Sequence, residues 1–310
     1  MYTTLISAAQ LQALRDSGAP LMVFDCSFDL MNPAAGEAQY REAHLPGAVY
    51  ANLDTALSDK GTPDAATGKP QPPADAASGG RHPLPSREKF AAWLSSVGFD
   101  NTMQAVVYDR QGANYCGRLW WMLKWAGHDA VAVLDGGLPA WQAEGGAVVA
   151  GDEPSHFQAN FRLGEPLRTL ATTQSVLAGL QGVQTIIDAR AAPRFRGEVE
   201  PLDPVAGHIP GALNRPFQAN TGPDGKFKPA AQLRAEFEAL LAGRDFDWKS
   251  AWTAVVSVGL RPCTGALIVL TFALVNGMVT AGVLSVLAMA LGTAITVSVL
   301  ATLAVTAKNV

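Results

Sequence analysis

The chain has 310 residues and a small net charge of −4, from 23 basic and 27 acidic residues. Its length allows two domains, because single hydrophobic cores seldom extend beyond about 250–300 residues. The slight acidic excess provides no general attraction for nucleic acid, so we expect no nucleic-acid partner. Cys26, Cys116 and Cys263 lie far apart in the sequence without a C-x-x-C pair, so neither a disulfide framework nor a cysteine-based zinc site is indicated, and a reducing, cytosolic compartment fits best. We expect no metal and no cofactor.

The first half of the sequence alternates between strand-like and helix-like segments. In chain order these are a strand in "LMVFDCS" (21–27), a helix in "PSREKFAAWLSSVGF" (85–99), a strand "AVVYD" (105–109), a helix "GRLWWMLKWAG" (117–127), a strand in "AVAVLDGG" (130–137) and a short helix "LPAWQAEGG" (138–146). Residues 58–81 are rich in Pro, Gly, Ala and Asp and are predicted to be a surface excursion. Strands that alternate with helices predict a parallel α/β sheet.

The same local pattern occurs a second time. "HLPGA" (44–48) recurs as "HIPGA" (208–212), and each copy follows an apolar strand that ends in Asp, the second being "TIIDAR" (185–190). Because His44 and His208 occupy matching positions before a Pro-Gly turn, we interpret both as structural turn residues, not as bases or metal ligands. Asp135, Gly136 and Gly137 are likewise interpreted as a turn, with Trp141 packed beneath it.

The second copy starts near Leu170 and includes a helix predicted over 230–242. Where the first copy continues with "AVVYD", the second continues with "AVVSVGLRPCTG" (254–265), and neither a "DGG" turn nor a closing Trp-containing helix follows. The second copy is therefore predicted to be truncated.

The C-terminal segment carries no charged residue and no histidine between Pro262 and Ala307. That length accommodates two membrane spans of about 20 residues each, divided at the Asn-Gly turn of "VNGM" (275–278). Arg261 would lie near the middle of the first span, where an arginine costs about 2.5–3.5 kcal/mol, so that span must be interrupted or shield the charge. A buried helical hairpin is the alternative. Lys249 and Lys308 flank the hairpin, and the N-terminal sequence does not resemble a secretory signal, so we expect both ends of the hairpin and the remaining chain to lie in the cytoplasm.

The tandem "D-x-[ASR] … H-[IL]-P-G-A" units and the closing "LDGGLPAWQAEGG" resemble the two-domain rhodanese sulfurtransferases, which include thiosulfate and 3-mercaptopyruvate sulfurtransferases. The resemblance covers about residues 5–244. It implies a catalytically silent first domain, in which Asp109 stands where an active domain carries its cysteine. It also implies a C-G-S-G-x-T-like nucleophile loop in the second domain, and this loop is absent.

By the same resemblance, "DARAAPRFRG" (188–197) contains the anion-binding residues. Asp188 and Arg190 would organise the site, while Arg194 and Arg196 would hold a small anionic sulfur donor. Arginine suits this role because its planar fork donates two parallel hydrogen bonds to an oxyanion. The alternative is that Arg194 and Arg196 are solvated loop charges and that Arg190 pairs with Asp188 or Glu198.

The cysteines provide one further alternative. Cys263 could act as the nucleophile with Arg261 as an activating cation, although it comes five or six residues later than Asp109 does in the first copy. Cys26 and Cys116 are interpreted as small buried hydrophobic residues. The catalytic residue is therefore unknown.

The tail "GLRPCTGALIVLTFAL … AMALGTAITVSVLATLAV" resembles the C-terminal part of nickel/cobalt efflux permeases, over about 60 residues. It has no counterpart of the His- and Asp-bearing helix with which such permeases bind metal. Transport by this segment alone is therefore not expected, but a non-catalytic anion-binding or regulatory module tethered to a permease is a possible function.

Taken together, the sequence predicts an α/β fold with tandem rhodanese-like domains, the second truncated, followed by a transmembrane-type helical hairpin. The predicted domains are 1–150, 165–247 and 248–310. The predicted function is that of a sulfurtransferase-family protein that is inactive or crippled, attached by residues 251–307 to the inner face of the cytoplasmic membrane. If the tail is not a genuine part of the protein, a cytoplasmic location is expected instead.

Overall fold

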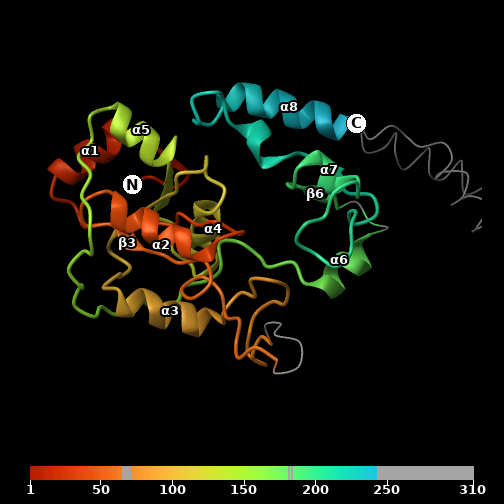
Figure 1. Cartoon of the computed structure of the whole chain (residues 1–310), viewed down its shortest axis with the longest axis horizontal. Coiled ribbons are helices and arrows are strands. Elements are labelled where there is room, and N and C mark those ends of the chain that lie inside the picture. Colours follow the sequence, from red (N-terminus) through yellow and green to blue (C-terminus); the bar gives the residue numbers. More distant parts are fainter. Residues whose placement is uncertain (65–70, 181, 183, 243–310) are drawn as a thin grey trace, which may run out of the picture. The chain divides into compact units, whose positions relative to one another are not determined.

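The computed structural model of the chain describes residues 1–64, 71–180, 182 and 184–242. The chain divides into two compact units, Met1–Leu233 and Arg234–Val310 (Figure 1). The predicted 248–310 hairpin and Cys263 lie outside the described residues. Within the described part, no helix combines the length and the apolar character that crossing a bilayer requires.

The first half of the chain, residues 1–150, is built on a five-stranded sheet with the strand order β1-β5-β4-β2-β3. The strands are β1 (Leu5–Ile6), β2 (Leu21–Asp25), β3 (Val49–Tyr50), β4 (Gln104–Tyr108) and β5 (Val131–Leu134). Every pairing between neighbouring strands is parallel. The predicted parallel α/β sheet is therefore confirmed.

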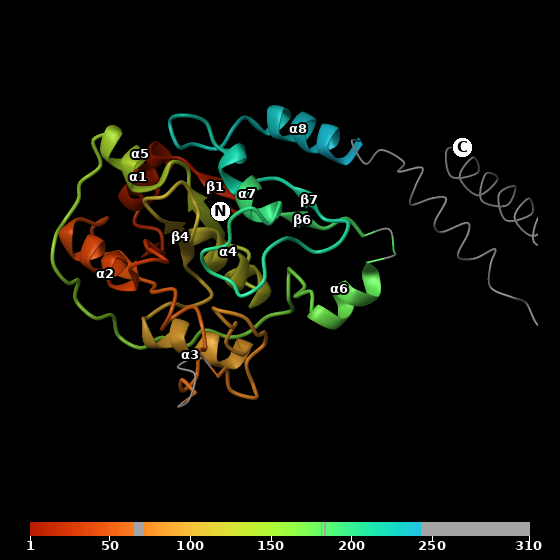
Figure 2. The same ribbon diagram turned by 45° about the vertical axis from the view of Figure 1, so that its right-hand side comes forward.

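Helices pack on this sheet in the manner typical of an α/β layer structure (Figure 2). They are α1 (Ala8–Asp16), α2 (Pro33–Glu42), α3 (Arg87–Ser96), α4 (Cys116–Trp125) and α5 (Gly137–Ala143). Alternate residues of β2 enter two separate hydrophobic clusters: Phe24 packs with residues of α3 and α4, whereas Val23 packs with residues of α1, α2 and α5. Because side chains alternate across a strand, both faces of the sheet are buried.

The second half, described from residue 165 to 242, has shorter elements. They are α6 (Thr173–Gly179), β6 (Ile187–Asp188), α7 (Ala192–Phe195), β7 (Leu213–Asn214), the 3-10 helix η1 (Phe217–Asn220) and α8 (Ala230–Ala242). β6 and β7 form a parallel pair. Asp188 lies opposite Asn214 as Asp25 lies opposite Tyr50, so the sequence repeat is also a repeat of strand register.

The second half differs from the first in its lack of a buried core. Among its described residues only Ala212 is buried, and α8 contributes no buried residue. Several of its apolar side chains are exposed, including Leu177, Val199 and Val205. In the described chain β6 pairs only with β7, whereas its counterpart β2 pairs on both sides. Little apolar surface is therefore removed from water here, and neither outer edge of the strand pair has a strand partner among the described residues.

We expect limited proteolysis of the intact chain to cut first between residues 165 and 242 and to leave residues 1–150 protected. Cleavage needs local opening, and opening costs least where few apolar contacts must be broken. The cleavage sites can be assigned by mass spectrometry of the fragments at successive times. Equal protection of the two halves would contradict this prediction.

Candidate functional site

The loop after β4 surrounds the carboxylate of Asp109 with backbone N–H groups. Oδ1 accepts from the N–H of Gln111 and of Ala113, both at 2.9 Å, and Oδ2 accepts from Tyr115 at 2.8 Å and Cys116 at 3.0 Å. Asp109 is only 1% exposed. The loop is therefore a closed anion-binding site whose anion belongs to the chain itself.

The local backbone explains how this loop forms. Gly112 and Ala113 both have left-handed dihedral angles, with φ of 69° and 64°, and successive turns of this kind direct N–H groups into one concave space. Helix α4 begins directly afterwards at Cys116, so the positive end of its dipole also faces the carboxylate. Such a loop would equally stabilise a thiolate at position 109, but a carboxylate there cannot carry sulfur.

In the second half, Asp188 and Arg190 form a tight local pair. The guanidinium of Arg190 donates to both carboxylate oxygens of Asp188, with an Nη2–Oδ2 distance of 2.6 Å, and this bonding lowers the pKa of Asp188. The backbone N–H of Arg190 also donates to Asp188, as the N–H of Ser27 donates to Asp25 in the first half. Asn214 secures the turn through its side-chain amide, which donates to the carbonyl oxygens of both residues.

Arg194 pairs with a carboxylate that the sequence analysis did not single out. Its Nε and Nη2 donate to the two oxygens of Glu200 at 2.8–3.1 Å, and Nη2 also donates to Asp203 at 3.0 Å. The Glu200 side chain is 5% exposed and lies 3.6 Å from Nη1 of Arg190. Burial raises the pKa of Glu200, but hydrogen bonds from the N–H groups of Asp203 and Leu202 and from Arg194 outweigh it, and the pKa falls to about 2.

Arg196 lies apart from this group and pairs with Glu198, with Nε–Oε1 at 2.7 Å and both side chains about half exposed. The structure therefore brings Asp188, Arg190 and Arg194 together around Glu200, without Arg196. Arg190 pairs with Asp188, as the alternative interpretation predicted, and the other partner named there, Glu198, pairs with Arg196. The predicted role of these arginines in holding a substrate anion stays a prediction.

Arg81, at the end of the surface excursion, joins this region, and its neighbour His82 pairs with Asp54; none of these three residues was predicted. Arg81 forms an ion pair with Asp203, and the neighbouring His82 places Nε2 3.0 Å from Oδ1 of Asp54. Burial, followed by the charge of Lys60, lowers the pKa of His82 to about 4 even though Asp54 opposes the shift, so the imidazole is neutral at pH 7. A cluster of basic residues inside a Pro- and Gly-rich segment was the sequence signal that could have indicated these residues.

The two repeated histidines make the same two local contacts, although His44 is buried and His208 is exposed. Nδ1 of His44 lies 2.7 Å from the carbonyl oxygen of Tyr40, and the imidazole stacks on the Tyr40 ring with 4.0 Å between the ring centroids. Nδ1 of His208 lies 2.7 Å from the carbonyl oxygen of Phe195, and the imidazole stacks on the Phe195 ring with 3.7 Å between the ring centroids. This shared geometry agrees with a structural role at the turn.

Two buried cysteines and the turn at residues 135–137 also have the structural surroundings that the sequence predicted. Cys26 and Cys116 are each 1% exposed, and burial raises the pKa of both thiols well above its ordinary value. Gly136 and Gly137 have positive φ, as the predicted turn requires, and the Asp135 carboxylate accepts the N–H of Phe227 at 2.7 Å.

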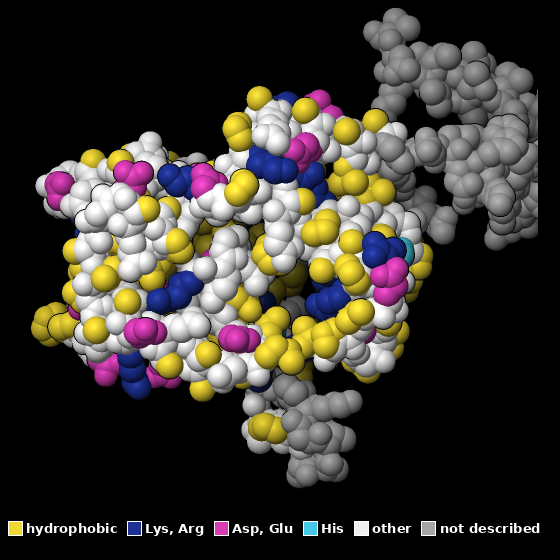
Figure 3. Space-filling model, turned by 45° about the horizontal axis from the view of Figure 1, so that its top comes forward, with side chains coloured by type: hydrophobic (Ala, Val, Ile, Leu, Met, Phe, Trp, Pro, Cys, Tyr) yellow, Lys and Arg dark blue, Asp and Glu magenta, His cyan; other side chains and the backbone are white. Residues whose placement is uncertain are grey.

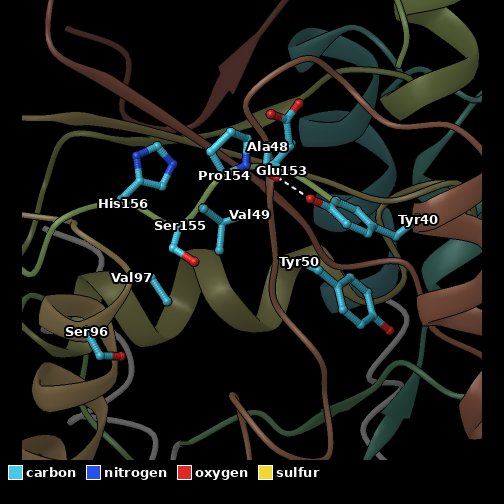
Figure 4. A pocket seen from close by; sticks show the side chains of 10 residues that line it. All are labelled: Tyr40, Ala48, Val49, Tyr50, Ser96, Val97, Glu153, Pro154, Ser155 and His156. Atoms are coloured by element: carbon cyan, nitrogen blue, oxygen red, sulfur yellow. Dashed lines mark hydrogen bonds between the residues drawn. The ribbon is translucent and has the colours of Figure 1, made fainter. Parts of the chain in front are cut away.

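A cavity of about 230 Å³ lies beside α2, β3 and the end of α3 (Figure 4). Its lining includes Tyr40, Tyr50, Ser96, Val97, Glu153 and His156. None of the predicted site residues lines this cavity, so it is separate from the arginine cluster.

Potential metal ligands are not clustered in the described residues. These residues contain no group of three or more His, Cys, Asp or Glu side chains that could hold a metal ion. On the face shown in Figure 3, basic and acidic side chains are interspersed and do not form a patch of one sign.

Comparison with protein families gives two matches. The model of the rhodanese-like domain matches residues 7–144, and that of the high-affinity nickel-transport protein matches residues 227–310.

Relatives cover most of the chain. A probable 3-mercaptopyruvate sulfurtransferase of Pseudomonas aeruginosa is 43% identical over 254 residues, which span 80% of this chain and 83% of the relative. A putative thiosulfate sulfurtransferase of Mycobacterium tuberculosis is 39% identical over 235 residues, 74% of this chain and 76% of the relative. Among solved structures, the 3-mercaptopyruvate sulfotransferase of Escherichia coli is similar with a TM-score of 0.60 and 26% identity, covering 79% of this chain and 85% of that one. The 3-mercaptopyruvate sulfurtransferase of Leishmania major gives a TM-score of 0.60 and 27% identity, covering 77% and 62%.

Proposed function

Because the chain belongs to the rhodanese-type sulfurtransferase family, we propose that it is an anion-binding derivative of these enzymes that does not itself transfer sulfur. One observation carries the proposal: the anion-binding loop after β4 holds the Asp109 carboxylate, and the second half has no C-G-S-G-x-T-like loop to provide a thiolate. Cys26 and Cys116 cannot replace it, because they are buried with raised pKa values.

The chemistry shows why a missing thiolate is decisive. In sulfur transfer the thiolate attacks the outer sulfur of thiosulfate or the thiol sulfur of 3-mercaptopyruvate, and a new S–S bond forms. The S–S bond of thiosulfate or the C–S bond of 3-mercaptopyruvate breaks, and the rest of the donor leaves with that electron pair as sulfite or pyruvate enolate. An acceptor thiolate or cyanide then attacks the outer sulfur and releases the thiolate again. A chain without an accessible thiolate can bind the donor but cannot take its sulfur.

The ligand in this proposal is a small anionic sulfur donor such as 3-mercaptopyruvate or thiosulfate. Asp188 and Arg190 would organise the site, and Arg194 and Arg196 would hold the anion. The relatives named for these two donors support the choice, and so does the concentration of guanidinium groups between residues 190 and 196.

Sulfur transfer by the intact chain tests the proposal. We expect thiosulfate or 3-mercaptopyruvate to be turned over at the rate without protein, with cyanide or a thiol as acceptor. The Cys263→Ser variant should behave like the natural chain. Turnover that Cys263→Ser abolishes would instead establish the alternative in which Cys263 is the nucleophile.

The proposed domain organisation is 1–150 and 165–247, rhodanese-like, followed by a membrane hairpin at 248–310. The uncharged stretch from Pro262 to Ala307 and the match to a nickel-transport family support the hairpin. In this organisation residues 251–307 attach the chain to the inner face of the cytoplasmic membrane. The chain should then stay with membranes through an alkaline carbonate wash and leave them only in detergent. Release by carbonate would contradict the anchor.

The nickel-transport match at 227–310 also favours a second function, that of an anion-binding or regulatory module tethered to a nickel/cobalt permease. No histidine follows His208, so metal transport by the chain alone is not part of this alternative. Co-purification of the detergent-solubilised chain with permease subunits would favour it, and purification as a single species would not.

A further inference from the structure

We propose that Asp203 occupies a binding site for a small oxyanion between Arg81 and Arg194, and that a ligand anion binds there by displacing the Asp203 carboxylate. This inference rests on the anion-binding function proposed above, and it names the residues at which binding takes place. It adds Arg81, which the sequence reasoning missed, and it assigns Asp203 as a competing internal ligand.

The geometry is that of one carboxylate shared by two guanidinium groups. Oδ1 of Asp203 pairs with Nη2 of Arg81, and Oδ2 accepts from Nη2 of Arg194 at 3.0 Å. Arg81 and Asp203 are 122 residues apart in the sequence, so the pair is formed by the fold and not by local chain direction. Two converging guanidinium groups are an arrangement that binds carboxylate, sulfonate and thiosulfate oxygens.

Asp203 is the carboxylate of this cluster that a ligand anion can displace from the arginines. Its side chain is 44% exposed, and its two ion pairs are the contacts that hold the carboxylate. Glu200, by contrast, is 5% exposed and accepts two backbone N–H bonds at 3.0 Å in addition to the fork of Arg194. Glu200 therefore fixes the position of Arg194, whereas Asp203 accepts from the same Nη2 with a more exposed carboxylate.

The ion pairs of Asp203 are weak enough for a ligand anion to replace its carboxylate. An exposed ion pair contributes only about 0.2–1 kcal/mol, so a free anion at millimolar concentration can compete with a tethered carboxylate for the same donors. An incoming anion would gain the hydrogen bonds that Asp203 gives up, and the exposed Asp203 carboxylate would be rehydrated. Removing the internal competitor should therefore tighten anion binding by up to about fivefold.

The experiment titrates the detergent-solubilised full chain with pyruvate and, separately, with thiosulfate, by isothermal calorimetry. Pyruvate offers a carboxylate and thiosulfate a sulfonate-like end, so the two titrations identify which oxyanion the site prefers. We expect Asp203→Asn to lower the Kd about threefold to fivefold and the double variant Asp203→Asn/Arg81→Gln to lose this gain. Asp152→Asn is the matched control, because Asp152 is also an exposed aspartate paired with an arginine, Arg41, at 2.9 Å. It should leave the Kd unchanged.

Each other outcome would contradict either this inference or the proposed anion-binding function. If Asp203→Asn binds no tighter than Asp152→Asn while retaining the natural circular dichroism spectrum, the displacement is wrong. If Glu198→Gln tightens binding and Asp203→Asn does not, the site is at Arg196 and the inference is also wrong. If no variant binds either anion, the proposed anion-binding function fails together with the inference. Sulfur transfer by the natural chain would overturn the proposed function alone, because the displacement concerns binding and not turnover.

Discussion

Joining residues 1–242 of this chain to the C-terminal part of the Pseudomonas aeruginosa relative is expected to raise sulfur transfer at least about 10³-fold over the natural chain. The two proteins are 43% identical over 254 residues, so the grafted segment should meet a compatible partner surface. The graft would supply the nucleophile loop that the family carries and that this sequence lacks. Because a missing nucleophile typically costs several orders of magnitude in rate, its return should dominate every other effect.

Two controls make this result interpretable. The same chimera with the grafted cysteine replaced by serine should return to the background rate. Thermal unfolding followed by circular dichroism should show that both chimeras fold alike. A folded chimera that is no more active than the natural chain would show that residues 1–242 have lost more than the nucleophile. If the natural chain instead turned over donor well above background and as fast as the chimera, nothing would be missing from it.

Asp109→Ala is expected to lower the free energy of unfolding of the first half by about 3–5 kcal/mol. The substitution removes the acceptor of four backbone N–H groups, at Gln111, Ala113, Tyr115 and Cys116. Buried N–H groups without acceptors carry their full desolvation cost, and the left-handed backbone of Ala113 would lose the contact that maintains it.

The measurement is urea unfolding followed by tryptophan fluorescence, which reports chiefly on the first half because five of the seven tryptophans lie within residues 93–141. The matched control is Asp29→Ala. Asp29 also accepts two backbone N–H bonds, from Met31 and Asn32, but at a solvent-accessible turn. The control should cost about 1 kcal/mol or less. Equal destabilisation by the two substitutions would show that the loop does not depend on its internal anion.

The repeated unit was predictable from the sequence because its determinants are local. A buried strand ending in Asp, followed by a histidine and a Pro-Gly turn, predicts the same short structure wherever it occurs, and β2–β3 and β6–β7 share one register. The amphipathic spacing of Phe90 and Leu94 predicted α3 for the same reason. The first turn of α1 escaped prediction, although Ser7 and Gln10 form a capping box there.

The partners of the arginines could not be read from sequence spacing. Arg194 pairs with Glu200 because the turn at 200–203 folds back and directs two N–H groups into the same carboxylate. Glu198 is closer along the chain but pairs with Arg196 instead. The contact between Arg81 and Asp203 depends on how the surface excursion lies against the second half, and no periodicity encodes it.

The chain contains two anion sites with different roles, the loop around Asp109 and the arginine cluster at residues 190–196. At the first, the loop after β4 binds an internal carboxylate that is buried and does not exchange, which serves stability. At the second, the arginines between residues 190 and 196 are paired with carboxylates of unequal exposure, which leaves Asp203 replaceable. Neither site contains a thiolate among its described contacts.

Mass spectrometry of the intact chain after incubation with thiosulfate or 3-mercaptopyruvate tests this account most directly. We expect the mass to stay unchanged, whereas a sulfurtransferase with an accessible nucleophile would gain one sulfur atom as a persulfide under the same conditions. An added sulfur atom on this chain, localised by peptide mapping to Cys26, Cys116 or Cys263, would contradict it.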